Sequence, residues 1–365
     1  MVLLAAAPLL AALAAASGAT AIPAASGLEL AGAPFVRYSP ETAWGFGAFG
    51  LAWFSADEVT KRAGRASWVG GALQYTTREQ ALAALQWDAY LAEGAWRTDG
   101  ALLAERWPHE WWGAGASTTS RSEPFTARTL RLDAGLSRLV LPAGPPGQGL
   151  WLGTRAGVRG DEVGAFEPGG AIGGCRVEAC RGGRWASLLA TVSWDTRDHV
   201  FAAWSGLWLT ARAGASRPLD GDGPGWRQLD LDLRGYRAAR PLPGQLSVQL
   251  RLSAASGHVP FHLLPTFGGD RSLRGVLEGR WRDGAAASAQ AEWAFPVAGR
   301  LGAALFGGAG TTGHRLGTLS AGRLVGAGGA GLRWVLDAGD RVSLRLDHGL
   351  TRGASQWYLA IGQSL

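Results

Sequence analysis

The sequence predicts a single all-β domain, a transmembrane antiparallel β-barrel of about 16 strands. Three observations lead to this prediction. Hydrophobic and polar residues alternate with period two, the polar faces carry Arg together with Asp, and the chain is rich in Gly (56) and Trp (18). Beyond the first two dozen residues no apolar run approaches the length of a membrane helix, so a chain that crosses a bilayer does so with strands.

The N-terminal segment 1–21 has the pattern of a signal peptide. A long apolar stretch is followed by small residues at Ala19 and Ala21, which suit a cleavage site. A buried N-terminal helix is the alternative, because no basic side chain precedes the apolar stretch. We expect 22–33 to be a short linker and 34–365 to be the barrel, exported to a cell outer membrane of the Gram-negative type.

Strand-like alternation is clearest in three segments of the second half. In 245–253, Leu246, Val248 and Leu250 share one face and polar residues take the other, and the same split recurs in 226–236 and 341–350. The polar faces combine arginine with aspartate, which suits a hydrated barrel interior whose apolar outside faces lipid. A soluble all-β protein with a shared core is the alternative.

Sixteen segments of about ten residues, the length that a tilted membrane strand needs, follow one another along the chain. They are 34–40, 44–55, 66–77, 80–91, 94–104, 125–138, 149–158, 184–194, 204–214, 226–238, 244–254, 285–296, 300–310, 326–336, 341–350 and 356–365. Long connections are predicted at 105–124, 159–183, 215–225, 255–284 and 311–325. Outer-membrane barrels have short periplasmic turns and longer outer loops, so we expect the long connections outside.

Tryptophans near the ends of these segments are expected to form interfacial girdles, with the ring in lipid and the N–H toward water. Those assigned to the lipid face are Trp53, Trp87, Trp194, Trp293 and Trp357. The last segment would close the barrel. Its residues with lipid-facing parity are Trp357, Leu359, Ile361 and Leu365.

The sequence shows no pattern typical of an enzyme or a cofactor site. Cys175 and Cys180 lie in one Gly-rich segment, and in an exported protein they most simply form a disulfide. No metal site is expected, because the six histidines are dispersed. Matches to G-x-G-x-x-G at 45–50, 308–313 and 326–331 lack the strand-to-helix context of a nucleotide site. Despite a net charge of +6, the arginines alternate along strands, so no nucleic-acid partner is expected.

Four stretches resemble the barrel of BamA/TamA-family outer-membrane proteins, the bacterial surface antigen type: 38–54, 193–206, 264–284 and 289–310. The family carries a hydrophobic residue, Arg, Gly and an aromatic residue in its sixth outer loop. The corresponding residues here are Leu273, Arg274, Gly275 and Val276, preceded by Gly268 and Gly269. The resemblance implies that this loop folds back into the lumen, where Arg274 meets acidic residues of the following strands.

This chain departs from the family pattern at two positions of the motif region. Val276 stands where the family usually has Phe or Tyr, and Gly308 stands where an Asp is usual. Glu292 matches the acidic position and shares the predicted lumen face with Ser288 and Gln290, so we expect it to be the one carboxylate partner of Arg274. A wet lumen would lower the cost of breaking this pair toward roughly 1 kcal/mol.

The resemblance implies that the barrel assists insertion or translocation of proteins or lipids, through a weak seam between its first and last strands. The implied partners are outer-membrane lipid and either unfolded outer-membrane protein clients or a separate periplasmic protein. We expect the barrel only, because the interval between signal and first strand leaves no room for POTRA repeats. A passive porin-like or structural barrel without assembly activity is therefore the alternative.

Overall fold

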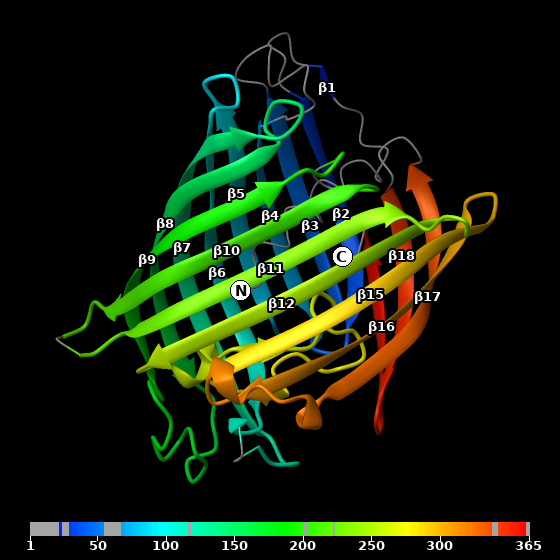
Figure 1. Ribbon diagram of the computed structural model, residues 1–365. Coiled ribbons are helices and arrows are strands. Elements are labelled where there is room, and N and C mark those ends of the chain that lie inside the picture. The colour runs from blue at the N-terminus through cyan, green and yellow to red at the C-terminus, as the bar shows by residue number, and fades with distance from the viewer. Residues whose placement is uncertain are drawn as a thin grey trace.

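The computed structural model is a closed barrel of sixteen antiparallel strands (Figure 1). The structure describes residues 22–23, 29–54, 67–115, 118–199, 203–221, 223–337 and 342–362, and the predicted signal peptide lies outside them. Each barrel strand pairs with its neighbours in the chain, and the last pairs with the first. A short β1 (Ile22–Pro23) pairs with the first barrel strand.

The barrel strands are β2 (Glu29–Ser39), β3 (Ala43–Phe54), β4 (Ser67–Thr76), β5 (Ala81–Leu91), β6 (Trp96–Trp111), β7 (Glu123–Pro142), β8 (Gly149–Gly164), β9 (Gly182–Asp195), β10 (Gly206–Pro218), β11 (Trp226–Ala238), β12 (Gln245–Gly257), β15 (Ala285–Ala298), β16 (Leu301–Gly313), β17 (Val325–Asp337), β18 (Val342–Thr351) and β19 (Ala354–Ile361). The predicted number and order of strands are confirmed. No helix among the described residues is long and apolar enough to cross a membrane.

Several strands are longer than the sequence predicts. β2 begins at Glu29, so 29–33 belongs to the barrel wall and not to a linker. β6 and β8 continue to Trp111 and Gly164, which shortens the loops that follow them. A strand can keep its ladder hydrogen bonds after it leaves the bilayer, so the end of an apolar alternation does not mark the end of the strand.

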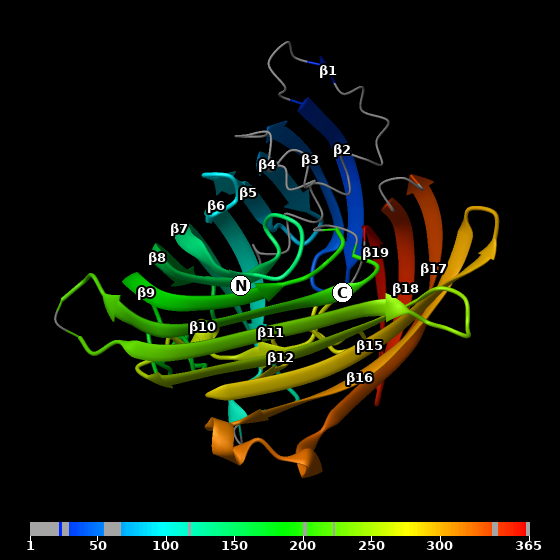
Figure 2. The same cartoon turned by 45° about the horizontal axis from the view of Figure 1, so that its top comes forward.

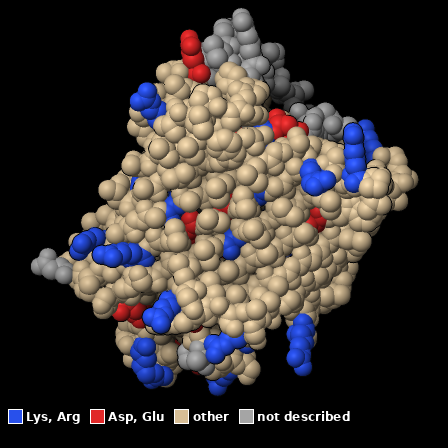
Figure 3. Space-filling model, viewed as in Figure 1, with Lys and Arg blue, Asp and Glu red and all other residues tan. Residues whose placement is uncertain are grey.

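The apolar faces of the strands point outward. Leu73, Leu130 and Leu188 each expose more than 60% of their surface, whereas Asp347 and Arg345 are buried inside. Figure 3 shows that the outer face over β16 and β17 is almost entirely uncharged. A soluble sandwich would bury its leucines in a shared core, so this alternation belongs to a barrel with an apolar outside and a charged interior.

The connections divide between the two ends of the barrel, as Figure 2 shows in part. The turns 92–95, 239–244 and 299–300 lie at one end, which we name the short-turn end. The opposite end, named the long-loop end, carries the short turns 40–42 and 77–80 together with longer connections. These longer connections are 112–122, 165–181, 258–284 and 314–324.

Four of the five selected tryptophans have outward parity, and Trp53 does not. Trp53 lies on the same face of β3 as Phe49 and Leu51, which are buried, and on the opposite face from the exposed Phe46. The prediction of a lipid-facing Trp53 is therefore wrong. Both faces of β3 carry large aromatic residues, so hydrophobicity alone does not distinguish inside from outside there.

Two of the four tryptophans with outward parity make further contacts. Trp293 donates its indole N–H to the Pro243 carbonyl at 2.9 Å, at the short-turn end. Trp357 is about half exposed and stacks on His348. Leu359 shares its parity, Ile361 ends β19, and Leu365 lies outside the described residues.

Candidate functional site

The connection 258–284, named here the lumen loop, turns back into the barrel between β12 and β15, the eleventh and twelfth barrel strands. It is the yellow segment inside the ring of strands in Figure 1. A one-turn helix, η3 (Phe261–Leu263), leads into a small hairpin of β13 (Thr266–Phe267) and β14 (Trp281–Arg282). The hairpin directs the predicted motif into the interior, where Leu273 and Arg274 are each only 1% exposed.

Glycine is needed at the tip of this loop for two physical reasons. Gly268, Gly269 and Gly275 all have positive φ, a conformation that other residues rarely adopt. The tip also touches the barrel wall closely, since a Cβ added at Gly349 of β18 would lie 2.7 Å from the Gly275 nitrogen. A side chain at either position would push the tip away from the wall.

Arg274 is held by two carboxylates and one aromatic ring. Its Nη2 lies 2.6 Å from Glu292 Oε2, and its Nη1 donates to Asp347 Oδ2 at 2.7 Å. The guanidinium carbon sits 3.7 Å from the centre of the Phe306 ring, which is within cation–π range. Glu292 is the partner that the sequence indicates, and Asp347 is a second partner that it does not.

The expectation of a single carboxylate partner is therefore wrong. Gly308 has no room for a side chain, because an added Cβ would lie 2.2 Å from the Ala289 carbonyl oxygen. The second carboxylate comes instead from β18, three strands beyond β15. Asp347 does lie on the polar face of 341–350, but periodicity assigns a face and says nothing about which strands a loop will reach.

Three further charged residues extend this contact into a balanced cluster. Arg333 pairs with Glu292 at 3.2 Å and with Asp347, while Arg345 pairs with Asp347 at 2.8 Å and with Asp270 of the loop. We name Asp270, Arg274, Glu292, Arg333, Arg345 and Asp347 the tip cluster; it holds three guanidiniums and three carboxylates. Buried charges are tolerated when each has an opposite partner, and here each has at least one.

Asp270 is the loop's own acid in the tip cluster. Burial alone would raise the pKa of its carboxyl, but the Arg345 guanidinium outweighs burial and holds that pKa below its usual value. Asp270 is therefore charged at neutral pH and adds a second ionic contact between the loop and β18.

Val276 packs in an apolar pocket next to the tip cluster. It is 2% exposed and forms a buried group with Phe267, Leu273 and Ala286. Phe267 occupies space above Gly310 of β16, where an added Cβ would lie 2.5 Å from its ring. Gly310 thus leaves room for the Phe267 ring, which fills the volume beside Val276, the residue that stands where the related motif carries an aromatic ring.

The base of the lumen loop has a different, apolar attachment. Phe261 packs edge-on against Trp111 and Phe125, with ring centroids 5.1 and 5.0 Å away, and the buried Ile172 completes the group. We name these four residues the base cluster. It joins the lumen loop to β6, β7 and the connection 165–181.

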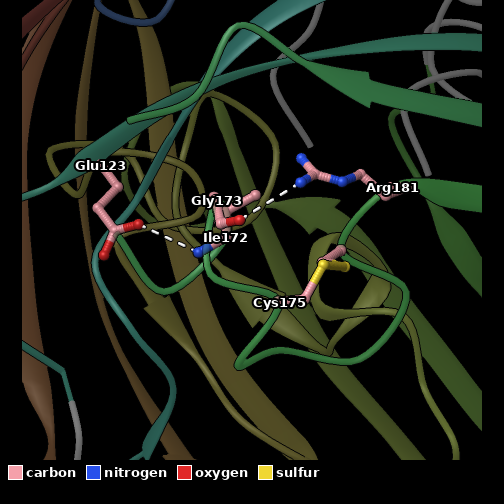
Figure 4. The surroundings of a disulfide bond; sticks show 6 residues. Glu123, Ile172, Gly173, Cys175 and Arg181 are labelled. Carbon is pink, nitrogen blue, oxygen red and sulfur yellow. Dashed lines mark hydrogen bonds between the residues drawn. A yellow bond between two sulfur atoms is a disulfide. The ribbon is translucent and has the colours of Figure 1, made fainter. Parts of the chain in front are cut away.

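The connection 165–181 contains the Cys175–Cys180 disulfide (Figure 4). The Glu123 carboxylate accepts hydrogen bonds from the backbone N–H groups of Ala171, at 2.8 Å, and Ile172, at 3.3 Å. Glu178 in the same connection accepts the Phe261 N–H through its carbonyl at 3.1 Å. The two loops therefore pack on each other across the long-loop end.

His262 makes a polar contact beside the base cluster. Its Nε2 lies 2.8 Å from Asp161 Oδ2 on β8. Burial lowers the pKa of His262; Asp161 opposes this shift, whereas Arg159 and Arg282 add to it. The docked imidazole is therefore neutral at pH 7.

The seam of the barrel lies between β19 and β2. Among the described residues these strands register at one pair, Leu359 with Tyr38, whereas β6 and β7 register at sixteen. The lumen loop touches both sides of the seam. The Gly275 N–H donates to the Tyr358 hydroxyl at 3.1 Å on β19.

On the other side, the Glu278 N–H donates to Glu41 Oε1 at 3.1 Å, in the turn between β2 and β3. Burial raises the pKa of Glu41, and the neighbouring Glu278 carboxylate raises it further. The loop thus links the first and last strands at the long-loop end, where their own ladder is short.

Comparison with family models and with curated proteins finds no match for this sequence. Solved structures with the same fold include BamA from Haemophilus ducreyi lacking POTRA domains 1-3, with a TM-score of 0.58, 13% identity, and coverage of 92% of this chain and 69% of that one. CdiB from Acinetobacter baumannii has a TM-score of 0.58 and 10% identity, covering 92% of this chain and 59% of that one.

CdiB from Escherichia coli has a TM-score of 0.55 and 12% identity, covering 94% of this chain and 64% of that one. The chain therefore spans less than two thirds of the length of either CdiB protein. At sequence identities this low, the similarity shows a shared fold and nothing more. The chain shares the sixteen-stranded barrel fold of BamA and CdiB.

Proposed function

We propose that this chain is an outer-membrane barrel of the BamA/TamA type, which assists the insertion or translocation of polypeptides at its seam. The observation that carries the proposal is the short ladder between β19 and β2, with a single registered pair among the described residues. The shared fold with BamA and CdiB, the apolar outer face and the docked lumen loop support it.

The physical basis is the chemistry of a strand edge. Each backbone hydrogen bond in a ladder contributes about 0.5–1.5 kcal/mol net, so a seam with few of them opens more readily than the other barrel strand pairs among the described residues. An opened edge presents N–H and C=O groups to which an incoming strand can add. The lumen loop, bonded to Tyr358 and linked to Glu41, would keep the two edges close when no client is present.

A reversible disulfide across the seam tests this proposal. Tyr38→Cys with Leu359→Cys would join the registered pair, and Leu250→Cys with Ala289→Cys would join β12 to β15 as a matched control. We expect barrels in liposomes to accelerate the folding of an added unfolded outer-membrane protein. Oxidation would stop this in the seam variant alone, and reduction would restore it.

Two results would contradict the proposal: no acceleration by the unmodified barrel, or full activity with the seam oxidised. Crosslinking in native envelopes would add a second measurement. Capture of a periplasmic partner or of a trapped client protein would support the proposed activity, because the barrel would then act together with other proteins.

The proposed location can be tested separately. We expect β-rich circular dichroism in detergent and a gel mobility that changes on heating, because the charged interior requires a closed barrel. Recovery of the mature protein as a soluble periplasmic monomer would contradict an outer-membrane location.

A passive barrel is the second candidate function, and the interior cavity favours it. This cavity has a volume of about 640 Å³ and is lined by charged groups that include Arg131, Arg212 and Asp230. Steady conductance across a planar bilayer, unchanged by oxidation of the seam pair and unaccompanied by any folding activity, would support the passive barrel instead.

A further inference from the structure

The outer wall of the barrel has a hollow of about 1170 Å³ that extends from β3 to β9, near the long-loop end. Two rows of cross-strand neighbours on β4 to β7 form its middle part. In the row nearer the middle of the wall, Leu73 pairs with Ala83, Ala83 with Ala104, and Ala104 with Leu130. The two alanines thus form a low floor between two leucines that are each more than 60% exposed.

The second row lies one step closer to the long-loop end and is polar. Tyr75 pairs with Ala81, Ala81 with Arg106, and Arg106 with Arg128. Tyr75 is 57% exposed on the outer face, as expected for a ring at the level of lipid headgroups. We name the two rows together the alanine groove. Its first row is apolar and faces the bilayer, and its second row is basic.

Arg106 and Arg128 stand directly opposite each other on adjacent strands, an arrangement in which like charges repel. Their carboxylate partners lie on the outer flanks of the pair. Arg106 Nη2 is 3.3 Å from Glu79 Oε2, and Arg128 Nη1 is 3.7 Å from Glu162 Oε2. All four side chains are 40% or more exposed, so these ion pairs contribute little.

Each guanidinium has five N–H donors, and these contacts use only part of them. A phosphate between the two arginines would relieve their repulsion and accept charge-assisted hydrogen bonds from both. Arg184, which pairs with Asp220 at 2.8 Å, lines the same hollow. Basic groups at the edge of an apolar surface are typical of sites that bind anionic lipid headgroups.

We propose that the alanine groove binds a phosphate-bearing lipid of the leaflet at the long-loop end. Its phosphate bridges Arg106 and Arg128, and one acyl chain lies on Ala83 and Ala104 between Leu73 and Leu130. A lipid fits better than a soluble anion, because the floor is apolar and lies on the outward face. The inference rests on the proposed membrane location but not on the insertion activity.

Native mass spectrometry of the folded barrel in detergent tests the headgroup contact. A phosphate-bearing lipid and a neutral lipid with the same chains are titrated separately. We expect the unmodified protein to prefer the phosphate lipid by about tenfold or more, and Arg106→Gln with Arg128→Gln to lose that preference. The matched control is Arg217→Gln with Arg227→Gln, which removes outward arginines of β10 and β11 and is expected to change binding less than about twofold.

The floor is tested by Ala83→Phe, which fills the groove. We expect it to abolish the preference for long over short acyl chains while the preference for phosphate remains. Inorganic phosphate in excess is expected not to displace the lipid. Equal weakening by the control pair, equal binding of the neutral lipid, or displacement by inorganic phosphate would each overturn the proposal.

The outcome is separable from the proposed function. Lipid binding is measured on a barrel whose folding is verified by its heat-dependent gel mobility, without a client protein. A lipid result against the groove leaves the seam experiment intact, and oxidation of the seam pair is expected to leave lipid binding unchanged.

Discussion

The lumen loop is attached to the barrel at two places that differ in chemistry. Its tip is held by buried opposite charges from β15 and β18, and its base is held by aromatic packing against β6, β7 and the connection 165–181. Ionic contacts inside a protein require every partner in place, whereas apolar contacts tolerate small shifts. The tip therefore fixes the geometry of the loop beside the seam, and the base joins the loop to the connection 165–181 at the long-loop end.

The largest effect is expected from Arg274→Ala. The Arg274 side chain is fully buried, so the lower cost expected for a wet lumen does not apply. Removing it leaves Glu292 and Asp347 short of positive charge, at a cost of about 3–5 kcal/mol. We expect the tip to detach, with faster proteolysis within 265–284 while the barrel stays folded.

Arg280→Ala is the matched control for that experiment. Arg280 lies in the same loop, over the ring of Trp281 and outside the tip cluster. Cleavage of Arg274→Ala at the rate of the control would show that the tip cluster does not hold the loop.

A smaller loss is expected from Phe261→Ala. Truncating a buried aromatic ring costs about 3 kcal/mol at the lower end of the usual range, and the neighbouring Trp111 and Phe125 can partly fill the space. We expect faster amide exchange in 258–264 and 165–181, with the tip unaffected. Equal exchange at the tip would show that the two attachments are not independent.

The disulfide tests the base from its other side. Replacing Cys175 and Cys180 together by Ser releases a small loop, at a cost of about 2 kcal/mol. We expect increased exchange in 165–181 and a weaker contact with Phe261, but no change at Arg274. In the native protein neither cysteine is expected to react with a thiol label on unreduced whole cells; labelling of both would contradict the linkage in the cell.

The smallest effect is expected from pH, through His262. When the base of the lumen loop is detached, His262 has an ordinary pKa near 6.5. When the base is packed on the barrel, burial lowers that pKa, so as the pH falls the detached form takes up a proton first. Docking of the base is therefore fully favoured above about pH 6.5 and weakens below it. The protection of the 258–264 amides from exchange, relative to free amides at the same pH, is measured from pH 7.5 to 5 and is expected to decrease. His262→Gln is expected to make this protection independent of pH.

Much of the fold could be predicted from the sequence. Period two is a local property of each strand, so the number of strands, their order and the two faces of β11, β12 and β18 follow from short windows. Arg274 could be found because a sequence motif marks it, and its partner Glu292 could be found because strand parity places Glu292 on the lumen face. Trp53 was misassigned because β3 has bulky residues on both faces.

Only the tertiary structure determined which distant parts of the chain come into contact. Asp347 contacts Arg274 because the lumen loop crosses the interior to β18, and Phe261 contacts Ile172 because two long loops pack on each other at the long-loop end. The short seam register depends on strand stagger around the closed ring, and the opposition of Arg106 to Arg128 depends on the register between β6 and β7. Alternation within a strand determines which of its faces points inward. Barrel closure and shear determine which residues of distant strands lie at the same level along the barrel axis, and no local sequence pattern encodes closure or shear.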